Sequence, residues 1–463
     1  MIGEGIFFVG LPNSPYLSSE MKLSSLLGHT RELLQLIHTS GNPADSLIDS
    51  FFRSHKYLGS HDRRFIAETV YGTLRHLRRC DVVLQRVVGG QRQGVPPEDG
   101  FLLLLVTYLL LVERRTVLSS GDLLPQLKSS RLKAILDDLL TKIPSQATDE
   151  EQEAAERIGI RYSYPRWMVE RFFSQYGEEE TERLCASLNE QASLTLRVNT
   201  LKTTVDGCQK LLKAEGVETK RTQLSPFGLE VPKRINIFQL QSFRDGMFEV
   251  QDEGSQLLPL LVDPKPTAKV LDACAGAGGK TLEFAALMNN RGEIVATDVQ
   301  KFRLEQLRKR LRRAGVSNVR IKEVKDLSTL SQQSSAYFDL VFVDAPCSGL
   351  GTIRRNPGMK WTVTEESVRE LSSKQLNILN TSAPLVKPGG KLVYATCTLL
   401  REENEDVVEA FLVQQKEYAV SDPLSYLSNF NLEKLASTRY TKLLPHRDGT
   451  DGFFCAVLER ARM

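Results

Sequence analysis

The sequence predicts an α/β protein whose largest part is a mostly parallel β-sheet, preceded by a small α/β subdomain and an all-helical N-terminal domain. In the C-terminal half, apolar runs of strand length alternate with helical stretches, a pattern typical of a parallel sheet covered on both faces. In the N-terminal part, apolar residues recur at helical spacing instead. The length of 463 residues agrees with this division, at roughly 150 residues per domain.

The helical domain is predicted over residues 21–143. Two amphipathic stretches, 26–37 and 65–77, place their apolar residues at the spacing of one helix face. Residues 1–20 are expected to form a tail. The polar and acidic residues 144–160 are expected to form a linker whose last part is helical.

Residues 161–246 are predicted to form the small α/β subdomain, because the alternation in Ser193–Val198 is typical of a half-buried strand. Residues 247–463 are predicted to form the main α/β domain. Its clearest strands are Lys269–Asp272, Glu293–Thr297, Phe338–Val343 and Lys391–Tyr394. Parallel strands place their carboxyl ends at one edge of a sheet, so the residues that follow these strands are expected to meet there.

The composition excludes several classes of protein. Hydrophobic residues make up 41% and charged residues 25%, which rules out fibrous and globally disordered chains. The net charge of +3 is small, so a polyanionic partner must be met by local basic patches. Seven cysteines without repeated spacing favour reduced thiols in a cytoplasmic protein, and no metal site is expected. The longest apolar run, Phe101–Val112, falls short of the ~18 residues that cross a bilayer, so no membrane partner is expected.

A glycine-rich loop follows the first of the clear strands. Glycines at a strand-to-helix turn let the backbone approach a ligand, and the first N–H groups of the helix are unpaired. A phosphate-binding loop would need a glycine five residues before Gly279, where the sequence has Cys274. A Rossmann-like site for a nucleoside cofactor fits better. The loop residues assigned to this site are Cys274, Ala275, Gly276, Ala277, Gly278, Gly279 and Lys280.

Acidic residues after the next two strands complete the expected cofactor site. A Rossmann-like site needs a carboxylate at the end of the second strand to hold the ribose hydroxyls. Asp298 stands there, twenty residues after Gly278. Asp326 follows the expected strand Val319–Lys322 and is assigned to the adenine amine.

Two cysteines each follow a strand of the predicted sheet. Cys347 lies in Asp344–Gly349, and Cys397 lies in Thr396–Thr398. A thiolate beside polar loop residues at that edge is suited to nucleophilic chemistry. The cysteines outside these loops and the glycine loop are expected to be small buried apolar residues; they are Cys80, Cys185, Cys208 and Cys455.

Three motifs resemble the signature set of the S-adenosylmethionine-dependent RNA cytosine-5 methyltransferases: Asp272–Thr281, Asp344–Gly349 and Tyr394–Thr398. The resemblance extends from about residue 160 to the C-terminus. Supporting matches are Arg197–Thr200, Gln251–Gln256, Arg354–Pro357 with Lys360 and Trp361, Glu403–Glu405, and Asp451–Phe454. Ala277, Gly358 and Thr398 depart from the residues that the family usually has, and none of the three departures removes a chemically active group.

The helical N-terminal region is similar to the antiterminator-like RNA-binding domain that is fused to one bacterial member of this family. Asp62–Arg64 and Tyr71–Arg75 carry this similarity. That member acts on small-subunit ribosomal RNA. The resemblance therefore implies 16S ribosomal RNA as the partner, either free or in an assembly intermediate, and a chain that acts as a monomer.

The resemblance also implies a mechanism. The enzyme would transfer a methyl group from S-adenosylmethionine to position 5 of a cytosine through a covalent cysteine adduct. Cys397 would be the nucleophile, Cys347 would assist breakdown of the adduct, and Asp344, which also belongs to the cofactor site, would hydrogen-bond the base edge. Lys280 and Asp298 would hold the methionine carboxylate and the ribose. From spacing alone, attack by Cys347 instead stays open.

Basic patches are predicted to bind the RNA phosphates. Seven Lys or Arg residues lie between Phe51 and Cys80, and eight lie between Lys301 and Arg320. Trp361 is a candidate contact for the target base or a core residue. The candidate RNA-binding residues are Arg63, Arg64, Arg79, Arg197, Asn199, Arg354, Arg355 and Lys360.

Two alternatives share most of these observations. A transfer RNA cytosine-5 methyltransferase has the same catalytic motifs, and a non-catalytic RNA-binding factor for ribosome assembly can keep the same fold. The intact set of candidate catalytic and cofactor residues, above all Cys347 and Cys397, favours an enzyme.

Overall fold

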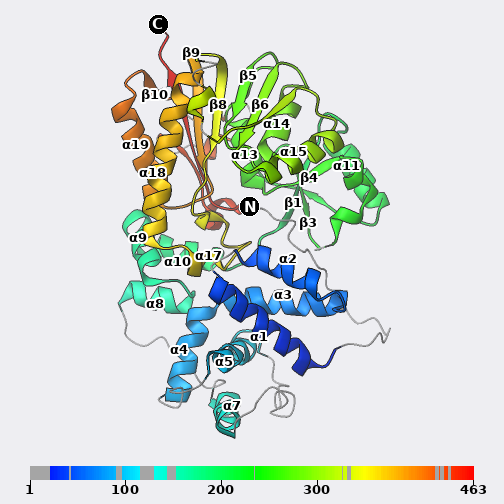
Figure 1. Cartoon of the computed structure of the whole chain (residues 1–463), viewed down its shortest axis with the longest axis vertical. Helices are drawn as coiled ribbons and strands as arrows, with labels where there is room; N and C mark the ends of the chain where they lie inside the picture. Colours follow the sequence, from blue (N-terminus) through cyan, green and yellow to red (C-terminus); the bar gives the residue numbers. More distant parts are fainter. Residues whose placement is uncertain are drawn as a thin grey trace. The chain divides into compact units, whose positions relative to one another are not determined.

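The computed structural model describes residues 21–40, 43–89, 96–114, 130–142, 153–233, 235–325, 327–330, 335–422, 427, 432–435 and 439–462 (Figure 1). The expected tail and Asp326 lie outside these residues. The chain forms two compact units. One contains Gln191–Thr352 and Val363–Met463, and the other contains the chain up to Glu190 together with Ile353–Thr362.

The described residues of the N-terminal unit form helices joined by turns and contain no strand, in agreement with the predicted all-helical N-terminal domain. Its most apolar helix, α5 (Pro97–Leu111), is surrounded by α1, α3, α4 and α7 and contributes Leu103, Leu105 and Leu109 to the core with no exposed surface. The helices are α1 (Leu23–Ser40), α2 (Ala44–Ser54), α3 (Ser60–Arg75), α4 (Leu77–Val88), α5, α7 (Ser130–Lys142), α8 (Ala154–Arg161), α9 (Arg166–Tyr176), α10 (Glu178–Ser187) and α17 (Met359–Thr362). No helix in the described part of the chain is long and apolar enough to cross a membrane.

The helices α8–α10 pack with this unit. The sequence prediction places residues from 161 onward in the small α/β subdomain, and hydrogen bonds account for their packing on the helical unit. The Arg78 side chain donates to Tyr164 O at 2.6 Å and pairs with Glu156 at 2.5 Å, and the Arg78 backbone N–H donates to Ser163 Oγ at 2.8 Å. These bonds join α4 to the α8–α9 turn across a long stretch of sequence, which composition alone does not reveal.

A small antiparallel sheet opens the second unit, with strand order β2-β3-β1-β4. The strands are β1 (Leu194–Val198), β2 (Lys220–Arg221), β3 (Gly228–Val231) and β4 (Phe248–Val250), accompanied by α11 (Val205–Ala214), the short turn η4 (Ile237–Gln239) and α12 (Gln241–Arg244). Because β4 pairs with β1, this sheet extends past the predicted boundary at residue 246.

The main sheet has the order β10-β12-β9-β8-β5-β6-β7, with β11 paired to β12. The run from β9 to β7 is parallel, and β12 is antiparallel to β9, so the predicted mostly parallel sheet is confirmed. The strands are β5 (Lys269–Asp272), β6 (Glu293–Asp298), β7 (Val319–Glu323), β8 (Phe338–Asp344), β9 (Val386–Thr396), β10 (Tyr418–Val420), β11 (Thr441–Leu443) and β12 (Phe453–Arg460).

Helices cover both faces of this sheet. Alternate strand residues divide between two cores, because successive side chains point to opposite faces. Val270 and Phe342 pack with Phe284 of α14, whereas Leu271 and Val343 pack with Phe411 of α19. Figure 1 shows α18 and α19 together on one side of the sheet. The covering helices are α13 (Glu253–Leu260), α14 (Gly279–Leu287) and α15 (Lys301–Ala314) on one face, and α18 (Glu365–Ser382) and α19 (Glu405–Gln414) on the other.

Short helical turns join several of these elements. They are η5 (Leu350–Thr352), η6 (Ala383–Leu385), η7 (Arg401–Glu403), η9 (Glu433–Leu435) and α21 (Pro445–Asp448). The turn η7 lies between β9 and α19 and places Glu403 beneath the loop that follows β9.

Candidate active site and cofactor site

The carboxyl ends of β5, β6, β8 and β9 form the candidate site. These four strands are parallel neighbours, so the loops that follow them meet at one edge of the sheet. The glycine loop follows β5, Asp298 ends β6, and Asp344 ends β8 with Cys347 three residues later. Cys397 follows the last residue of β9. The predicted catalytic and cofactor residues that the structure describes therefore lie along a single edge.

The glycine loop turns sharply between β5 and α14. Gly278 has a φ of +88°, and a Cβ atom there would lie 2.1 Å from a methyl group of Leu307, so only glycine fits. Ala275 N–H donates to Thr297 O at 2.8 Å, which fastens the loop to β6. Arg310 of α15 donates to Ala277 O at 2.9 Å and so holds the position where the family commonly has proline.

The β5 and β6 carboxylates fit a nucleoside cofactor carrying an amino acid. Asp298 is 7% exposed, and its two oxygens accept N–H bonds from Gly276 at 3.0 Å and Gln300 at 2.7 Å. A carboxylate has further lone pairs for ribose hydroxyls. Asp272 Oδ2 accepts the Thr281 hydroxyl, but its buried Oδ1 has no partner in the structure, and a ligand ammonium would supply the donor it lacks. Burial raises the pKa of Asp272 to about 7.

The two loop cysteines lie side by side. The Sγ atoms of Cys347 and Cys397 are 3.4 Å apart, and both side chains are partly buried. The hydrogen bond between the thiols raises the pKa of Cys347 and lowers the pKa of Cys397. Within the pair, Cys397 is therefore the easier thiol to ionise, as a nucleophile requires.

Lys280, at the end of the glycine loop, forms an ion pair with Asp344 at the end of β8. Its Nζ is 2.7 Å from Asp344 Oδ2. Burial alone lowers the pKa of Lys280, but the charge and hydrogen bond of Asp344 outweigh it and raise that pKa on balance. The ammonium stays charged and also favours the thiolate of Cys397. One of its three donors is used by Asp344, which leaves others for a ligand carboxylate.

Glu403 forms hydrogen bonds with both of the loops that carry Cys347 and Cys397. The sequence pattern did not assign this role. The Glu403 side chain has no exposed surface and accepts hydrogen bonds from Ser348 N–H at 2.8 Å, the Thr398 hydroxyl at 2.9 Å and Gln375 Nε2 at 3.0 Å. The only sequence signal was the Glu403–Glu405 match to the family.

Four of the predicted RNA-binding residues are buried, and the structure contradicts a direct phosphate contact for them. Arg197 is 4% exposed and donates to Glu283 at 2.9 Å and to Gly279 O at 2.7 Å. Asn199 donates to Gly246 O and Ala314 O, which ties the small sheet to α15. Arg197 therefore holds the backbone of the cofactor loop, and Asn199 holds the small sheet against α15. The polar groups of both side chains are used inside the fold.

Lys360 and Arg354 are the other two corrections. Lys360 has no exposed surface, and its Nζ lies 2.6 Å from Asn189 Oδ1 and 3.1 Å from the carbonyl oxygens of Arg75 and Ser163. Arg354 is 6% exposed, and its carbonyl accepts a hydrogen bond from Arg75. Trp361 is partly buried and packs against the core of the helical unit, where its Nε1 donates to Leu74 O at 2.6 Å.

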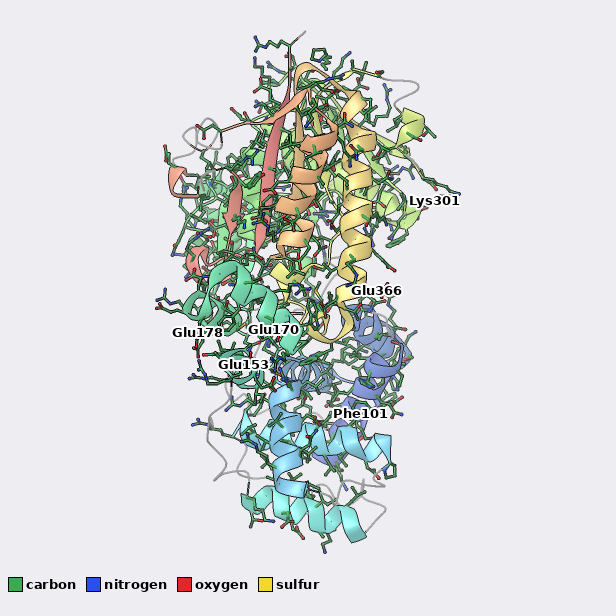
Figure 2. All side chains as sticks on the ribbon, turned by 90° about the vertical axis from the view of Figure 1, so that its left-hand side faces the viewer. Phe101, Glu153, Glu170, Glu178, Lys301 and Glu366 are labelled. Atoms are coloured by element: carbon green, nitrogen blue, oxygen red, sulfur yellow. The ribbon has the colours of Figure 1, made fainter. Side chains whose placement is uncertain are left out.

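The remaining candidates keep partly exposed side chains. They are Arg63, Arg64, Arg79 and Arg355. Arg63 Nε donates to Leu58 O, and Arg64 Nε pairs with Glu68 at 3.0 Å. In the second basic patch, Arg310 and Arg313 are used by the buried Glu249, whereas Lys301 extends from the start of α15 (Figure 2).

Comparisons with known proteins identify the family. Residues 259–459 match the family model of the 16S rRNA methyltransferases RsmB/F, and residues 164–238 match the ferredoxin-like domain of RsmF/B-like methyltransferases. The chain is 33% identical to the probable ribosomal RNA small subunit methyltransferase B of Synechocystis over 93% of its own length and 98% of that protein.

Solved structures share the fold. The structure of PH0851 has a TM-score of 0.74 and 28% identity, covering 96% of this chain and 100% of that one. A methyltransferase homologue from Pyrococcus horikoshii has a TM-score of 0.57 and 30% identity, covering 67% of this chain and 100% of that one. With the glycine loop, Asp298 and the paired cysteines at one sheet edge, the chain belongs to the RsmB/F family of rRNA methyltransferases, and its cofactor is S-adenosylmethionine.

Proposed function

We propose that the protein methylates position 5 of a cytosine in 16S ribosomal RNA through a covalent adduct on Cys397. The observation that supports this most directly is that the Sγ atoms of Cys347 and Cys397 lie 3.4 Å apart. Their hydrogen bond lowers the pKa of Cys397 and raises the pKa of Cys347. One thiol is sufficient to attack the base. A second thiol at this distance therefore indicates that it acts in a separate step of the reaction. The Lys280–Asp344 ion pair lies beside them.

The first step is attack on the base. Position 5 of cytosine is a weak nucleophile until a thiolate adds to position 6 and makes the neighbouring carbon electron-rich. Cys397 forms this bond, and Asp344, held by Lys280, hydrogen-bonds the base edge and stabilises the adduct. S-adenosylmethionine supplies the methyl group. Asp298 holds its ribose, and Lys280 offers its remaining donors to the methionine carboxylate.

The second step is release. After methylation, position 5 still carries its hydrogen, which must leave as a proton while the electron pair re-forms the ring double bond and expels the Cys397 thiolate. Cys347 is suited to accept this proton. Its raised pKa comes first from the hydrogen bond to Cys397, and this cause disappears once Cys397 is bound to the base. Cys347 then loses its own proton to solvent and takes the one from position 5, so the two thiols return to their starting state.

The target base must leave any stack to reach the thiols. The partly exposed arginines of the helical unit, Arg63, Arg64 and Arg79, are proposed to bind phosphates of the same RNA, and Arg355 is a fourth candidate. We propose that the protein acts as a monomer in the cytoplasm, on free 16S ribosomal RNA or an assembly intermediate.

Bisulfite sequencing tests the substrate. Purified protein with S-adenosylmethionine is expected to create 5-methylcytosine at one site in 16S ribosomal RNA transcripts and none in transfer RNA. If 5-methylcytosine appears in transfer RNA alone, the substrate is transfer RNA and not 16S ribosomal RNA. Binding of 16S RNA without any methylated product, in protein that binds the cofactor, would indicate a non-catalytic assembly factor.

Denaturing gels test the division of labour between the cysteines. Cys397→Ala is expected to abolish methyl transfer and to form no covalent RNA complex. Cys347→Ala is expected to methylate once and then accumulate a complex that survives denaturation, because proton removal is blocked. Cys208→Ala, in a buried thiol of α11, serves as the control. A stable complex from Cys397→Ala but not from Cys347→Ala would reverse the two roles.

A further inference from the structure

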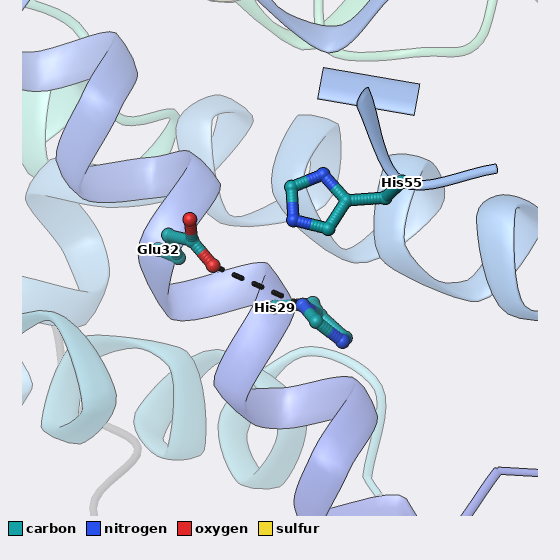
Figure 3. A group of neighbouring side chains, drawn as sticks. All are labelled: His29, Glu32 and His55. Atoms are coloured by element: carbon teal, nitrogen blue, oxygen red, sulfur yellow. Dashed lines mark ion pairs between the residues drawn. The ribbon is translucent and has the colours of Figure 1, made fainter. Parts of the chain in front are cut away.

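Among the described residues, one group of three side chains has the composition of a metal site, and it belongs to the helical unit. His29 and Glu32 project from α1, and His55 directly follows α2 (Figure 3). One ligand atom from each residue lies within 4.8 Å of the other two. We propose that these residues bind a divalent transition-metal ion of the zinc type, which joins α1 to the end of α2.

The hydrogen bonds around the two rings leave suitable atoms for a metal. His55 Nδ1 lies 2.8 Å from Phe51 O. A carbonyl oxygen can only accept a hydrogen bond, so Nδ1 carries the proton and donates to it. The lone pair of Nε2 therefore stays available. His29 Nε2 lies 3.2 Å from Tyr57 Oη, and its Nδ1 faces Glu32 Oε2 at 3.8 Å. Metal-bound histidines are commonly oriented in this way, through a hydrogen bond on the nitrogen that does not bind the metal.

Contacts with neighbouring aromatic rings hold the His29 and His55 side chains in place without a metal. The His55 ring stacks on Phe51 with centroids 4.0 Å apart, and the two histidine rings meet edge to face at 5.4 Å. His29 and Glu32 are three residues apart on one helix and therefore share a face. Glu32, whose side chain is 59% exposed, is the mobile ligand that can close onto the ion.

The ligand set selects the metal. Bonds of ~2.0–2.1 Å at tetrahedral angles place the ligand atoms on zinc roughly 3.3 Å apart, so a modest contraction of the present spacing suffices. Two imidazoles and one carboxylate suit Zn²⁺, Co²⁺ or Ni²⁺, whereas Mg²⁺ and Ca²⁺ prefer oxygen ligands alone. Three protein ligands leave a fourth position for water. Because α1 and α2 are separate helices, binding would stabilise the helical unit.

No pattern in the sequence indicates this site. His29 and His55 stand 26 residues apart and match no metal-binding spacing, and the expectation of no metal site rested on the cysteines alone. The helical unit brings the two histidines together. The proposal is independent of the methylation chemistry.

A zinc titration of the full chain tests the proposal. The protein carries Cys347→Ser and Cys397→Ser, so that the paired thiols cannot bind the ion, and it is treated with a chelator first. One zinc ion per chain is expected to bind and to raise the Tm. His29→Ala and His55→Ala should each weaken binding by at least ~10-fold, the loss that even an outer hydrogen-bond partner can cause. His61→Ala, an exposed histidine of α3 outside the group, is the matched control.

Cobalt spectra separate this site from the remaining thiols. A Co²⁺ complex of the proposed site is expected to lack a thiolate-to-metal charge-transfer band, because all three ligands are nitrogen or oxygen. A thiolate band, or zinc binding that is equal in wild type, His29→Ala and His55→Ala, would overturn the assignment. The assignment would also be overturned if zinc did not bind to the protein that keeps all three ligands, while circular dichroism showed that this protein and the variants were folded.

Discussion

Ser348 and Thr398 each directly follow one of the two loop cysteines, and their hydroxyl oxygens lie 2.8 Å apart. Both hydroxyls also donate to the same carboxylate oxygen of Glu403, at 2.5 and 2.9 Å. The spacing of the two thiols is therefore set by a buried carboxylate beneath the loops. Burial raises the pKa of Glu403, although four hydrogen bonds oppose that rise.

Glu403→Gln is expected to lower the methylation rate and the stability together. The amide has a similar shape, but its NH₂ group faces donors that need an acceptor, and an unsatisfied buried group costs about 1–3 kcal/mol. Methyl transfer and thermal unfolding would be measured side by side. Glu366→Gln, on the exposed start of α18 (Figure 2), should change neither. Wild-type activity in Glu403→Gln would show that the carboxylate does not position the cysteines.

Asp298→Ala should weaken binding of S-adenosylmethionine, or of its demethylated product, by at least ~1 kcal/mol, since charge-assisted bonds to the ribose are lost. Asp298→Asn keeps one acceptor and should fall between wild type and alanine. Calorimetry measures both. Glu305→Ala, on the exposed side of α15, controls for a general loss of negative charge. Equal affinities for wild type and Asp298→Ala would remove Asp298 from the cofactor site.

Simultaneous reversal of Arg63, Arg64 and Arg79 to Glu should weaken RNA binding and reduce its salt dependence. Each lost phosphate contact lowers the slope of log K against log salt by about 0.7–0.9. Filter binding over a salt series measures the slope, and cofactor affinity should stay unchanged. The control reverses Arg157, Arg161 and Arg183, which pair with glutamates of α10. An unchanged slope in the test variant would identify its arginines as an ordinary solvated surface.

The position of the glycine loop in the fold could be predicted because its signals are local. Gly278 needs a positive φ, and Asp298 ends a strand, so both follow from position in the strand–turn–helix pattern. The cysteines could be placed at the same edge for the same reason. Their mutual contact could not be predicted, since it depends on how β8 and β9 align in the sheet.

Burial of charged residues was the main failure of prediction. Lys360 and Arg197 belong to motifs that the family resemblance assigns to RNA binding, yet each contacts oxygen acceptors supplied by distant segments: Asn189 and Ser163 for Lys360, and Glu283 for Arg197. A lysine or arginine can be buried only when such partners exist. Those partners come from tertiary structure, which one sequence does not display.

The last prediction concerns the protonation of Cys397. Only the thiolate reacts with iodoacetamide, so the alkylation rate rises as pH passes the pKa of the thiol. Because the hydrogen bond with Cys347 lowers the pKa of Cys397, the midpoint for Cys397 should lie below that of an ordinary cysteine thiol. Cys347→Ala removes this hydrogen bond and should move the midpoint upward. Cys347→Ser keeps a hydrogen-bonding group and should move it less. Mass spectrometry of the Cys397 peptide across pH measures all three proteins, and identical midpoints in wild type and Cys347→Ala would show that the neighbouring thiol does not activate the nucleophile.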